Sequence, residues 1–457
     1  MEKNNGAKRD FGSFHSSNVE ELIHLSESEY KSPKLDVAFD LSVFEKFEFG
    51  SSDLKKNFFY LDERFCFLNH GAFGLSFKPV LDYVHEWKCY AESQPLRFYD
   101  RQIMPLLVDL IRKFSSMIFK CKPNELALVD NCTFAFNSLI SSLDLSPGDK
   151  IFIFSTTYGV YKKILKDYCI KKKAILIEEA ISFPIIDEKD LMQKTLGKFK
   201  SILSEDEEDK KIRLVLIDHI PSNQPFLVPI DRISEYCKSK RSDILFVVDA
   251  AHSLGSVKNF TIDQYPNIDI MFTNCHKWFC GPKGTGFLYV KEISFRIRPS
   301  VQSHGINSGF NSEFIWSGLK DYASFLGLYA SLNIWLHYFG GFDKPIEYCY
   351  SMVRQASEYL KNLWQTSFMV DPSLCSTMVC VQLPDSFVRN IIKNDDLESS
   401  FSYNDAEIVQ NFFYFSHSIE VPIKYIQNSL YVRLSAHIYN KIEDYEFLGD
   451  VVMQNVE

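Results

Sequence analysis

Short apolar runs alternate with longer segments of mixed polarity through the middle of the chain. The short runs predict buried strands, and the segments between them, including 131–143 and 229–239, predict helices. The predicted strands cover residues 125–129, 150–154, 174–177, 212–218, 246–249, 269–272 and 286–290. Apolar strands that alternate with helices are typical of an α/β fold with a doubly wound, mostly parallel sheet covered on both faces.

The pattern differs at the two ends of the chain. Residues 1–60 are polar and weakly patterned, which predicts a partly ordered N-terminal extension. Residues 61–319 contain the alternating pattern and form the predicted large domain. In residues 320–457, two long helical stretches lead to separated strands near 377–382 and 430–435, which predicts a smaller C-terminal α+β domain.

Composition narrows the class of protein. The chain has 457 residues, of which 46% are hydrophobic, and a net charge of -9, which argues against a general binder of nucleic acid or of anionic membranes. No apolar run is long enough for a membrane span, and the N-terminus lacks the apolar core of a secretory signal. The 11 cysteines have neither disulfide-framework nor zinc spacing. We therefore expect a reduced cytoplasmic protein without a metal site.

Two groups at strand ends suggest the chemistry. The run 246–249 ends in Asp249, and Lys277 follows the next apolar run. The carboxyl ends of parallel strands meet at one sheet edge, where ligands bind. A carboxylate and a lysine together there are the groups that hold pyridoxal phosphate, because the lysine forms a Schiff base with the aldehyde and the acid pairs with the pyridinium nitrogen. The alternatives are a helix-capping acid and a surface lysine, although His276 and Trp278 make an unusual surface neighbourhood.

Other residues are candidates for the same cofactor. Cys132 and Thr133 lie between a strand and a helix, where backbone N–H groups bind phosphate. Tyr158 follows a strand end and is placed to stack on a ring, and His252, three residues after Asp249, is placed to reach the ring oxygen. The alternatives are an ordinary helix cap, a packed tyrosine and a core histidine.

Several motifs occur in an order that resembles one family. They lie within residues 65–440 and comprise the segments 69–74, 94–99, 129–133, 248–253, 274–278 and 432–437. In this order they resemble class V aminotransferase-like enzymes of fold type I. Within that family, 217–220, 248–252 and 274–278 are similar to the eukaryotic L-cysteine desulfhydrase-like and isopenicillin N epimerase-like branch.

The resemblance implies a role for each candidate. Lys277 binds the cofactor, Asp249 pairs with its pyridinium nitrogen, His252 lies near the ring oxygen and Tyr158 stacks on the ring. The remaining cofactor-binding residues that it implies are Cys132, Thr133, Asn274 and His276. It also implies that Arg433 pairs with the substrate carboxylate, that Arg97 and Asn69 are further substrate-binding residues, and that the enzyme is a homodimer.

The chain departs from the family pattern in two places. Leu319 stands where the family usually has a threonine that contacts the neighbouring subunit's phosphate, and Ser317 is the nearest hydroxyl that would compensate. Cysteine desulfurases also need a cysteine on a mobile loop to take the sulfur. Here Cys375 and Cys380 flank a predicted core strand, so that persulfide chemistry is not expected.

The predicted function is a pyridoxal-phosphate-dependent lyase. In it Lys277 removes the Cα proton of a cysteine-like amino acid and a sulfur group leaves from Cβ. An epimerase, an aminotransferase and a cysteine-sulfoxide lyase share the first step and remain alternatives. A non-catalytic protein with the same fold is a rival that Leu319 favours, while the presence of Lys277, Asp249 and Arg433 together opposes it. A dinucleotide-binding oxidoreductase is not expected, since the glycine fingerprint is missing.

Overall fold

A seven-stranded sheet forms the centre of the computed structural model, which describes residues 18–205, 211–291, 296–393 and 400–456. The strand order is β2-β8-β7-β6-β5-β3-β4, and among these strands β8 runs antiparallel to both of its neighbours. The strands are β2 (Leu126–Val129), β3 (Lys150–Phe154), β4 (Ile175–Glu179), β5 (Ile212–Asp218), β6 (Leu245–Asp249), β7 (Ile270–Asn274) and β8 (Gly286–Val290).

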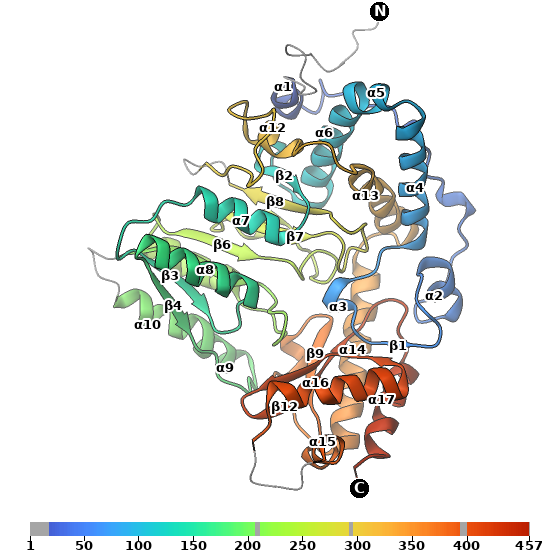
Figure 1. Ribbon diagram of the computed structural model, residues 1–457, viewed down its shortest axis with the longest axis vertical. Coiled ribbons are helices and arrows are strands. Elements are labelled where there is room, and N and C mark those ends of the chain that lie inside the picture. Colours follow the sequence, from blue (N-terminus) through green and yellow to red (C-terminus); the bar gives the residue numbers. More distant parts are fainter. Residues whose placement is uncertain (1–17, 206–210, 292–295, 394–399, 457) are drawn as a thin grey trace, which may run out of the picture.

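Both faces of the sheet are covered by helices, as Figure 1 shows. Successive side chains of a strand point to opposite faces. In β3, Ile151 and Ile153 join one apolar cluster with helices α7 and α8, whereas Phe152 and Phe154 join the other cluster with α6 and α11. This burial on both faces explains why the strands are continuous apolar runs and confirms the predicted doubly wound α/β fold.

The helices have the following bounds in chain order. They are α1 (Val19–His24), α2 (Ser52–Phe58), α3 (His70–Phe73), α4 (Lys78–Ser93), α5 (Pro95–Arg97), α6 (Ile103–Phe114), α7 (Cys132–Ser142), α8 (Gly159–Lys172), α9 (Glu188–Met192), α10 (Lys198–Ser204), α11 (Ile230–Lys240), α12 (Phe310–Ile315), α13 (Ala323–Asn333), α14 (Asp343–Trp364), α15 (Asp385–Ile392), α16 (Tyr403–Asn411) and α17 (Ile442–Met453).

The C-terminal part is a small α+β unit at the lower end of Figure 1. Its antiparallel sheet has the order β11-β12-β9, formed by Ile423–Ile426, Ser429–Ser435 and Met378–Gln382, and α14 packs against both β9 and α17. Strand β1 (Cys66–Phe67) pairs with β10 (Ile419–Glu420), so that the segment preceding the large sheet is tied to this unit. The predicted limits of the domains remain a prediction.

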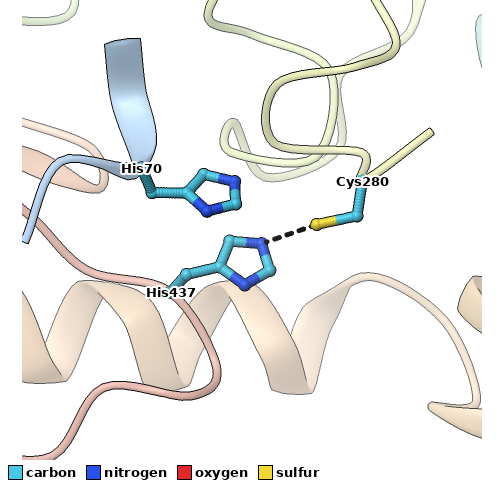
Figure 2. A group of neighbouring side chains, drawn as sticks. All are labelled: His70, Cys280 and His437. Carbon is cyan, nitrogen blue, oxygen red and sulfur yellow. Dashed lines mark hydrogen bonds between the residues drawn. The ribbon is translucent and has the colours of Figure 1, made fainter. Parts of the chain in front are cut away.

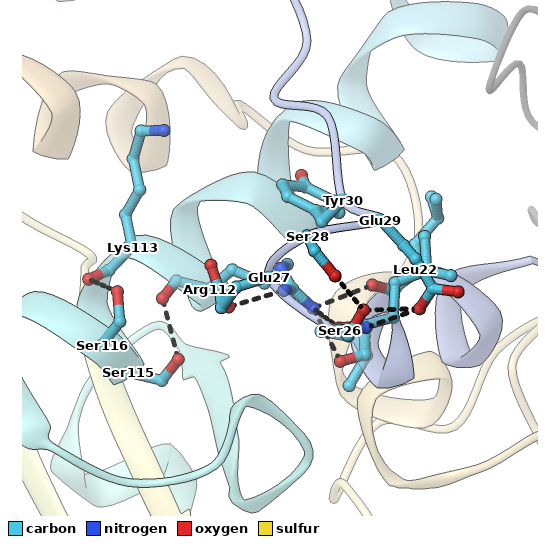
Figure 3. A network of polar contacts seen from close by, with 12 residues as sticks. Leu22, Ser26, Glu27, Ser28, Glu29, Tyr30, Arg112, Lys113, Ser115 and Ser116 are labelled. Atoms are coloured by element: carbon cyan, nitrogen blue, oxygen red, sulfur yellow. Dashed lines mark hydrogen bonds and ion pairs between the residues drawn. The ribbon is translucent and has the colours of Figure 1, made fainter.

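A buried arginine anchors the N-terminal segment to the large domain. Arg112 of α6 donates from Nη1 to the carbonyl oxygens of Leu22, Ile23 and Leu25, at the end of α1, over 2.9–3.2 Å. Its Nη2 is 2.6 Å from Oε1 of Glu27 (Figure 3). The last carbonyls of a helix have no partner within it, and a cation suits that end of the helix dipole. The arginine therefore satisfies the end of α1 where it meets the core.

Among the described residues, no helix has both the length and the apolar character that a membrane crossing requires.

Replacing Arg112 tests this anchor. Arg112→Met leaves buried carbonyl oxygens without donors, so we expect the free energy of unfolding to fall by about 3 kcal/mol, measured by urea denaturation. Arg64→Met is the matched control, because Arg64 is largely exposed and its ion pair, among the residues that the structure describes, is with the nearby Asp62. Equal stability of the two variants would contradict the anchoring role.

Candidate active site

A cavity of about 260 Å³ opens at the carboxyl edge of the large sheet. It lies at the switch point of the topology, where the chain leaves β3 for the edge strand β4 and returns through β5 to β6 and β7. Ends of β5, β6 and β7 and the start of α7 contribute to its wall. All of the predicted cofactor-binding residues line it: Cys132, Thr133, Tyr158, Asp249, His252, Asn274, His276 and Lys277.

Two carboxyl groups lie side by side in the cavity. Asp218 ends β5, Asp249 ends β6, and the two residues are paired in register. One oxygen of Asp249 accepts from the N–H of Ala251 at 2.8 Å, and Oδ2 of Asp218 accepts from the N–H of Tyr158 at 3.0 Å. Oδ1 of Asp218 is buried without a partner among the described residues. A buried polar atom of this kind points to a ligand group.

The two carboxyl groups differ in protonation. Burial, followed by the nearby charge of Asp249, raises the pKa of Asp218 well above its usual range. Burial also raises the pKa of Asp249, to about 6, but the Ala251 N–H and Lys277 oppose this rise. Burial and mutual repulsion therefore favour a proton on this pair, and the contacts that oppose the rise at Asp249 make Asp249 the member that keeps its charge more readily.

Lys277 is half-buried at the wall of the cavity and faces a histidine. Its Nζ is 3.0 Å from Nε2 of His252, and the indole N–H of Trp278 donates to Nδ1 of the same histidine at 3.2 Å. Burial, as the main cause, lowers the pKa of Lys277, and it also lowers the pKa of His252 well below its usual range. A lysine with a lowered pKa is a usable nucleophile and base.

The start of α7 offers an anion site. The side chain of Asn131 caps the helix by accepting from the N–H of Phe134 at 2.9 Å, and the N–H of Cys132 donates to Oδ1 of Asn274 at 3.0 Å. Asn274 thereby connects the end of β7 to the helix. The N–H of Thr133 belongs to the same first turn, where backbone N–H groups and the helix dipole favour an anion such as phosphate.

Tyr158 and His276 form opposite parts of the wall. Tyr158 precedes α8, is 40% exposed and packs edge-on against Tyr161 with ring centroids 5.4 Å apart. Nδ1 of His276 is 3.3 Å from the carbonyl oxygen of Thr285, and burial, chiefly, lowers the pKa of His276 to about 4. The tyrosine is thus free to stack, while the histidine is a neutral wall residue.

Arg433 and Asn69 lie beside the cavity, next to each other. Arg433 donates from Nη2 to Oδ1 of Asn69 at 2.9 Å and from Nη1 to the carbonyl oxygen of Ser222, a lining residue, at 2.5 Å. Nε of Arg433 is buried without a partner, and no carboxylate pairs with this guanidinium among the described residues. Burial lowers the pKa of Arg433 to about 10, so it remains cationic at neutral pH. An unpaired buried cation favours an anionic ligand.

Arg97 and Leu319 lie outside the cavity wall of their own chain. Arg97 belongs to α5, its guanidinium lies 4.6 Å from the centre of the Tyr90 ring, and Nη2 is 3.4 Å from the hydroxyl of Ser93. Leu319 is 74% exposed in the loop between α12 and α13. Within one chain, the structure does not bring Arg97 together with the other candidates.

Cys375 and Cys380 are enclosed on the small sheet. Each is 1% exposed, and their thiols donate to the carbonyl oxygens of Pro225 (3.2 Å) and Asn223 (3.7 Å). They therefore hold the 222–225 loop, which contains the lining residue Ser222, and neither lies on a mobile loop of its own.

Two histidines support the turn that carries Lys277. Nε2 of His70 donates to the carbonyl oxygen of Lys277 at 3.1 Å, and Nε2 of His437 lies 3.4 Å from that of Trp278 and 3.5 Å from Sγ of Cys280 (Figure 2). The two rings stack at 4.0 Å and 16°. Ring nitrogens bind metals in the ring plane, and two nearly parallel planes at this spacing do not converge on one ion. We interpret this cluster as support for the lysine turn.

From the sequence, no site role was predicted for Asp218, Ser222, His70 and His437, although Asp218, His70 and His437 lie in segments that resemble the family. Asp218 carried the same signal as Asp249, an acid ending an apolar run, but the sequence did not show that the two strands are neighbours. The two histidines are 367 positions apart in the chain, since 437 - 70 = 367, and no local pattern connects them.

Comparisons with known proteins agree with this geometry. Residues 111–448 match the family model described as aminotransferase class-V. A probable chloroplastic L-cysteine desulfhydrase of Arabidopsis thaliana is 26% identical over 424 residues, 88% of this chain and 85% of the relative. An L-cysteine desulfhydrase of the same plant is 26% identical over 432 residues, 89% and 91% of the two chains.

A solved structure shares the fold. It is a cystine C-S lyase in complex with its reaction product, cysteine persulfide, and it superposes with a TM-score of 0.67 at 17% identity, over 85% of this chain and 97% of the other.

The carboxyl pair gives a pH-dependent prediction for the cofactor-free protein. Both folded-state pKa values are raised, so the pair's contribution to stability is fully present below about pH 4 and is lost as pH rises through about 6 for Asp249 and further for Asp218. Asp218→Asn keeps an acceptor for Tyr158 but cannot ionise. The difference in free energy of unfolding between this variant and the wild type should therefore shift in favour of the variant as pH rises above 4. The shift should reach up to about 1.4 kcal/mol per pH unit, measured by thermal unfolding. A difference independent of pH would refute the protonation state that we assign to Asp218.

Proposed function

Because this chain belongs to the class-V aminotransferase family, we propose that it is a pyridoxal-phosphate-dependent lyase that removes a sulfur group from a cysteine-like amino acid. The observation that carries the proposal is the meeting of Lys277 and Asp249 in one cavity with a helix N-terminus. These are the groups that this cofactor requires for its aldehyde, its ring nitrogen and its phosphate.

The residues present fit pyridoxal phosphate. Lys277 and Asp249 would hold its two ends, the first turn of α7 its phosphate, and Tyr158 the face of its ring, while the unpartnered Oδ1 of Asp218 faces the same space. When bound, the cofactor withdraws electrons from the substrate's Cα and so makes the loss of its proton feasible.

The chain's own groups perform the proton and binding steps. Asp249 carries negative charge near neutral pH and so favours a proton on a ring nitrogen beside it. Lys277, with its lowered pKa, has a lone pair available to accept the substrate's Cα proton at Nζ. Arg433 retains an unpartnered Nε–H toward an anion, which suits the substrate carboxylate.

The choice of elimination over its alternatives rests on the relatives. Epimerisation, transamination and cleavage of a cysteine sulfoxide also begin with the loss of the Cα proton. Two relatives that align over most of their length are L-cysteine desulfhydrases, which favours loss of sulfur from Cβ. The non-catalytic alternative is opposed by the burial of Asp249 and Arg433 and by the lowered pKa of the half-buried Lys277 beside them, since ionisable groups in such surroundings cost stability.

We further propose a cytoplasmic homodimer. Exposed apolar side chains beside the site support the second copy: Phe73, which lines the cavity, is 79% exposed, and Leu319 is 74% exposed. The cytoplasmic location remains a prediction from the sequence.

The decisive experiment uses purified protein supplied with pyridoxal phosphate. The wild type should show the visible absorbance band of the lysine-bound cofactor and release sulfide and pyruvate from L-cysteine. Lys277→Ala should lack the band and lose at least about 1,000-fold in kcat, as expected when the nucleophile and base are removed. Lys291→Ala is the control, because the Nζ of Lys291 donates to the carbonyl oxygen of Pro266, away from the residues that line the cavity. A band without sulfide release would favour the epimerase or aminotransferase alternatives, and the lack of a band in the wild type would overturn the enzyme assignment.

The two candidate arginines can be separated by kinetics. Arg433→Lys keeps the charge but loses the planar fork, so KM for L-cysteine should rise by about 10- to 100-fold, equivalent to about 1–3 kcal/mol. Arg97→Met should change KM less than about twofold, since Arg97 lies outside the cavity of its own chain. A large effect of Arg97→Met would instead place Arg97 at the site of a second subunit.

A further inference from the structure

The indole of Trp278 fixes which nitrogen of His252 carries a hydrogen. An indole N–H only donates, so Nδ1 of His252, 3.2 Å away, must be the acceptor and carries no hydrogen. His252 is buried, and burial, followed by the charges of Lys277, Arg433 and His70, lowers its pKa well below the usual range. A neutral imidazole with an unprotonated Nδ1 has its hydrogen on Nε2.

The protonated Nε2 then determines the state of Lys277. Nε2 lies 3.0 Å from Nζ, and an N–H that points at this nitrogen requires a lone pair there. An ammonium group has three donors and no acceptor, so it would face another donor at hydrogen-bond distance. The contact is therefore satisfied only when Lys277 is a neutral amine.

We infer that Trp278 is a positioning residue that sets the tautomer of His252 and, through it, keeps the Lys277 amine unprotonated before the cofactor binds. This inference deepens the proposed function and rests on it, since a free amine has the lone pair that both carbonyl attack and proton removal need.

The indole has little freedom to turn away. Trp278 is fully buried, its ring lies 4.9 Å from that of His70, and it stacks on His437 at 6.2 Å and 22°. His437 follows β12 of the small domain, so both domains define the direction of the indole N–H. The histidine pair of Figure 2 thereby gains a second effect: it supports the turn and orients the donor.

Other titratable groups around Lys277 influence it as well. After burial, which lowers its pKa, the groups that face it are Cys132 of α7, Asp249 of β6, Arg433 of β12 and Asp218 of β5. Asp249, the charged member of the carboxyl pair, favours the ammonium form, and Arg433 opposes it. The tautomer of His252 also affects whether Lys277 is protonated, and the indole N–H of Trp278 determines that tautomer.

The test measures the protonation of Lys277 in cofactor-free protein. Lysines are labelled briefly with an amine-selective acylating reagent across a pH series, and the labelled peptide that contains Lys277 is quantified by mass spectrometry, with the other lysines as references. Trp278→Phe removes the donor, which frees His252 to place its hydrogen on Nδ1 and accept from an ammonium group. We expect the labelling midpoint of Lys277 to rise by on the order of one pH unit.

Two controls separate this effect from simple loss of packing. Trp335→Phe also removes a buried indole N–H, one that donates to the carbonyl oxygen of Phe279 at 2.8 Å, and it should leave the midpoint unchanged. His252→Asn should raise the labelling midpoint of Lys277 by itself. Adding Trp278→Phe to this variant should have no further effect, because the imidazole that connects Trp278 to Lys277, the relay, is then missing. If Trp278→Phe does not fold, the test is the rise in the labelling midpoint of Lys277 in His252→Asn.

The outcomes are distinguishable from failure of the proposed function. An unchanged midpoint in Trp278→Phe, or the same shift with and without His252, overturns the relay. If the wild type binds pyridoxal phosphate while the relay fails, the proposed function stands. If the wild type does not bind it, the proposed function fails whatever the midpoint shows.

Discussion

The need to keep one lysine amine neutral at the wall of a largely buried cavity governs the arrangement of this site. An ammonium group in such a place is costly, so burial itself shifts Lys277 toward the neutral form. Its neighbours are consistent with that state. Burial lowers the pKa of His252 and so favours its neutral form, and of the two adjacent carboxyl groups Asp249 keeps its charge more readily. The cavity therefore has a single well-placed negative group facing a nucleophile that retains its lone pair.

This arrangement requires both domains. The large sheet brings the strand ends together, but the turn after β7 is fixed from outside by His70 and by His437 of the small domain. Arg433 reaches the same region from β12 by donating to Ser222 and Asn69. The pairing of β1 with β10 holds the two parts at this distance, since it links the residues just before His70 to the small domain. The site is thus a property of the interface between the domains.

The sequence predicted those features that depend on local order. The strands 150–154, 212–218 and 286–290 were predicted with the bounds that the structure shows, because a strand buried on both faces is a continuous apolar run. The α/β fold and the family were also predicted correctly. The antiparallel direction of β8 and the pairing of Asp218 with Asp249 were not, because strand order depends on long-range packing. The same limit applies to Arg97, whose motif predicted a place at the site but whose position within one chain lies outside the cavity. The roles of the site residues themselves remain predictions.

The fate of the sulfur follows from the state of the cysteines near the cavity. Capture of sulfur by the protein needs a thiolate, because the thiolate and not the thiol is the nucleophile. Cys375 and Cys380 use their S–H groups to hold backbone carbonyls of the 222–225 loop. Among the described residues that line the cavity, Cys132 is the cysteine, and burial, followed by the charge of Asp249, raises its pKa well above the usual value. All three sulfurs are therefore held as thiols. To take the sulfur, a protein thiolate would have to attack it while it is still bonded to Cβ, so that the electron pair of the C–S bond stays on carbon. Among the described residues that line the cavity no cysteine is held as a thiolate, which favours release of the sulfur as sulfide over transfer to a protein cysteine.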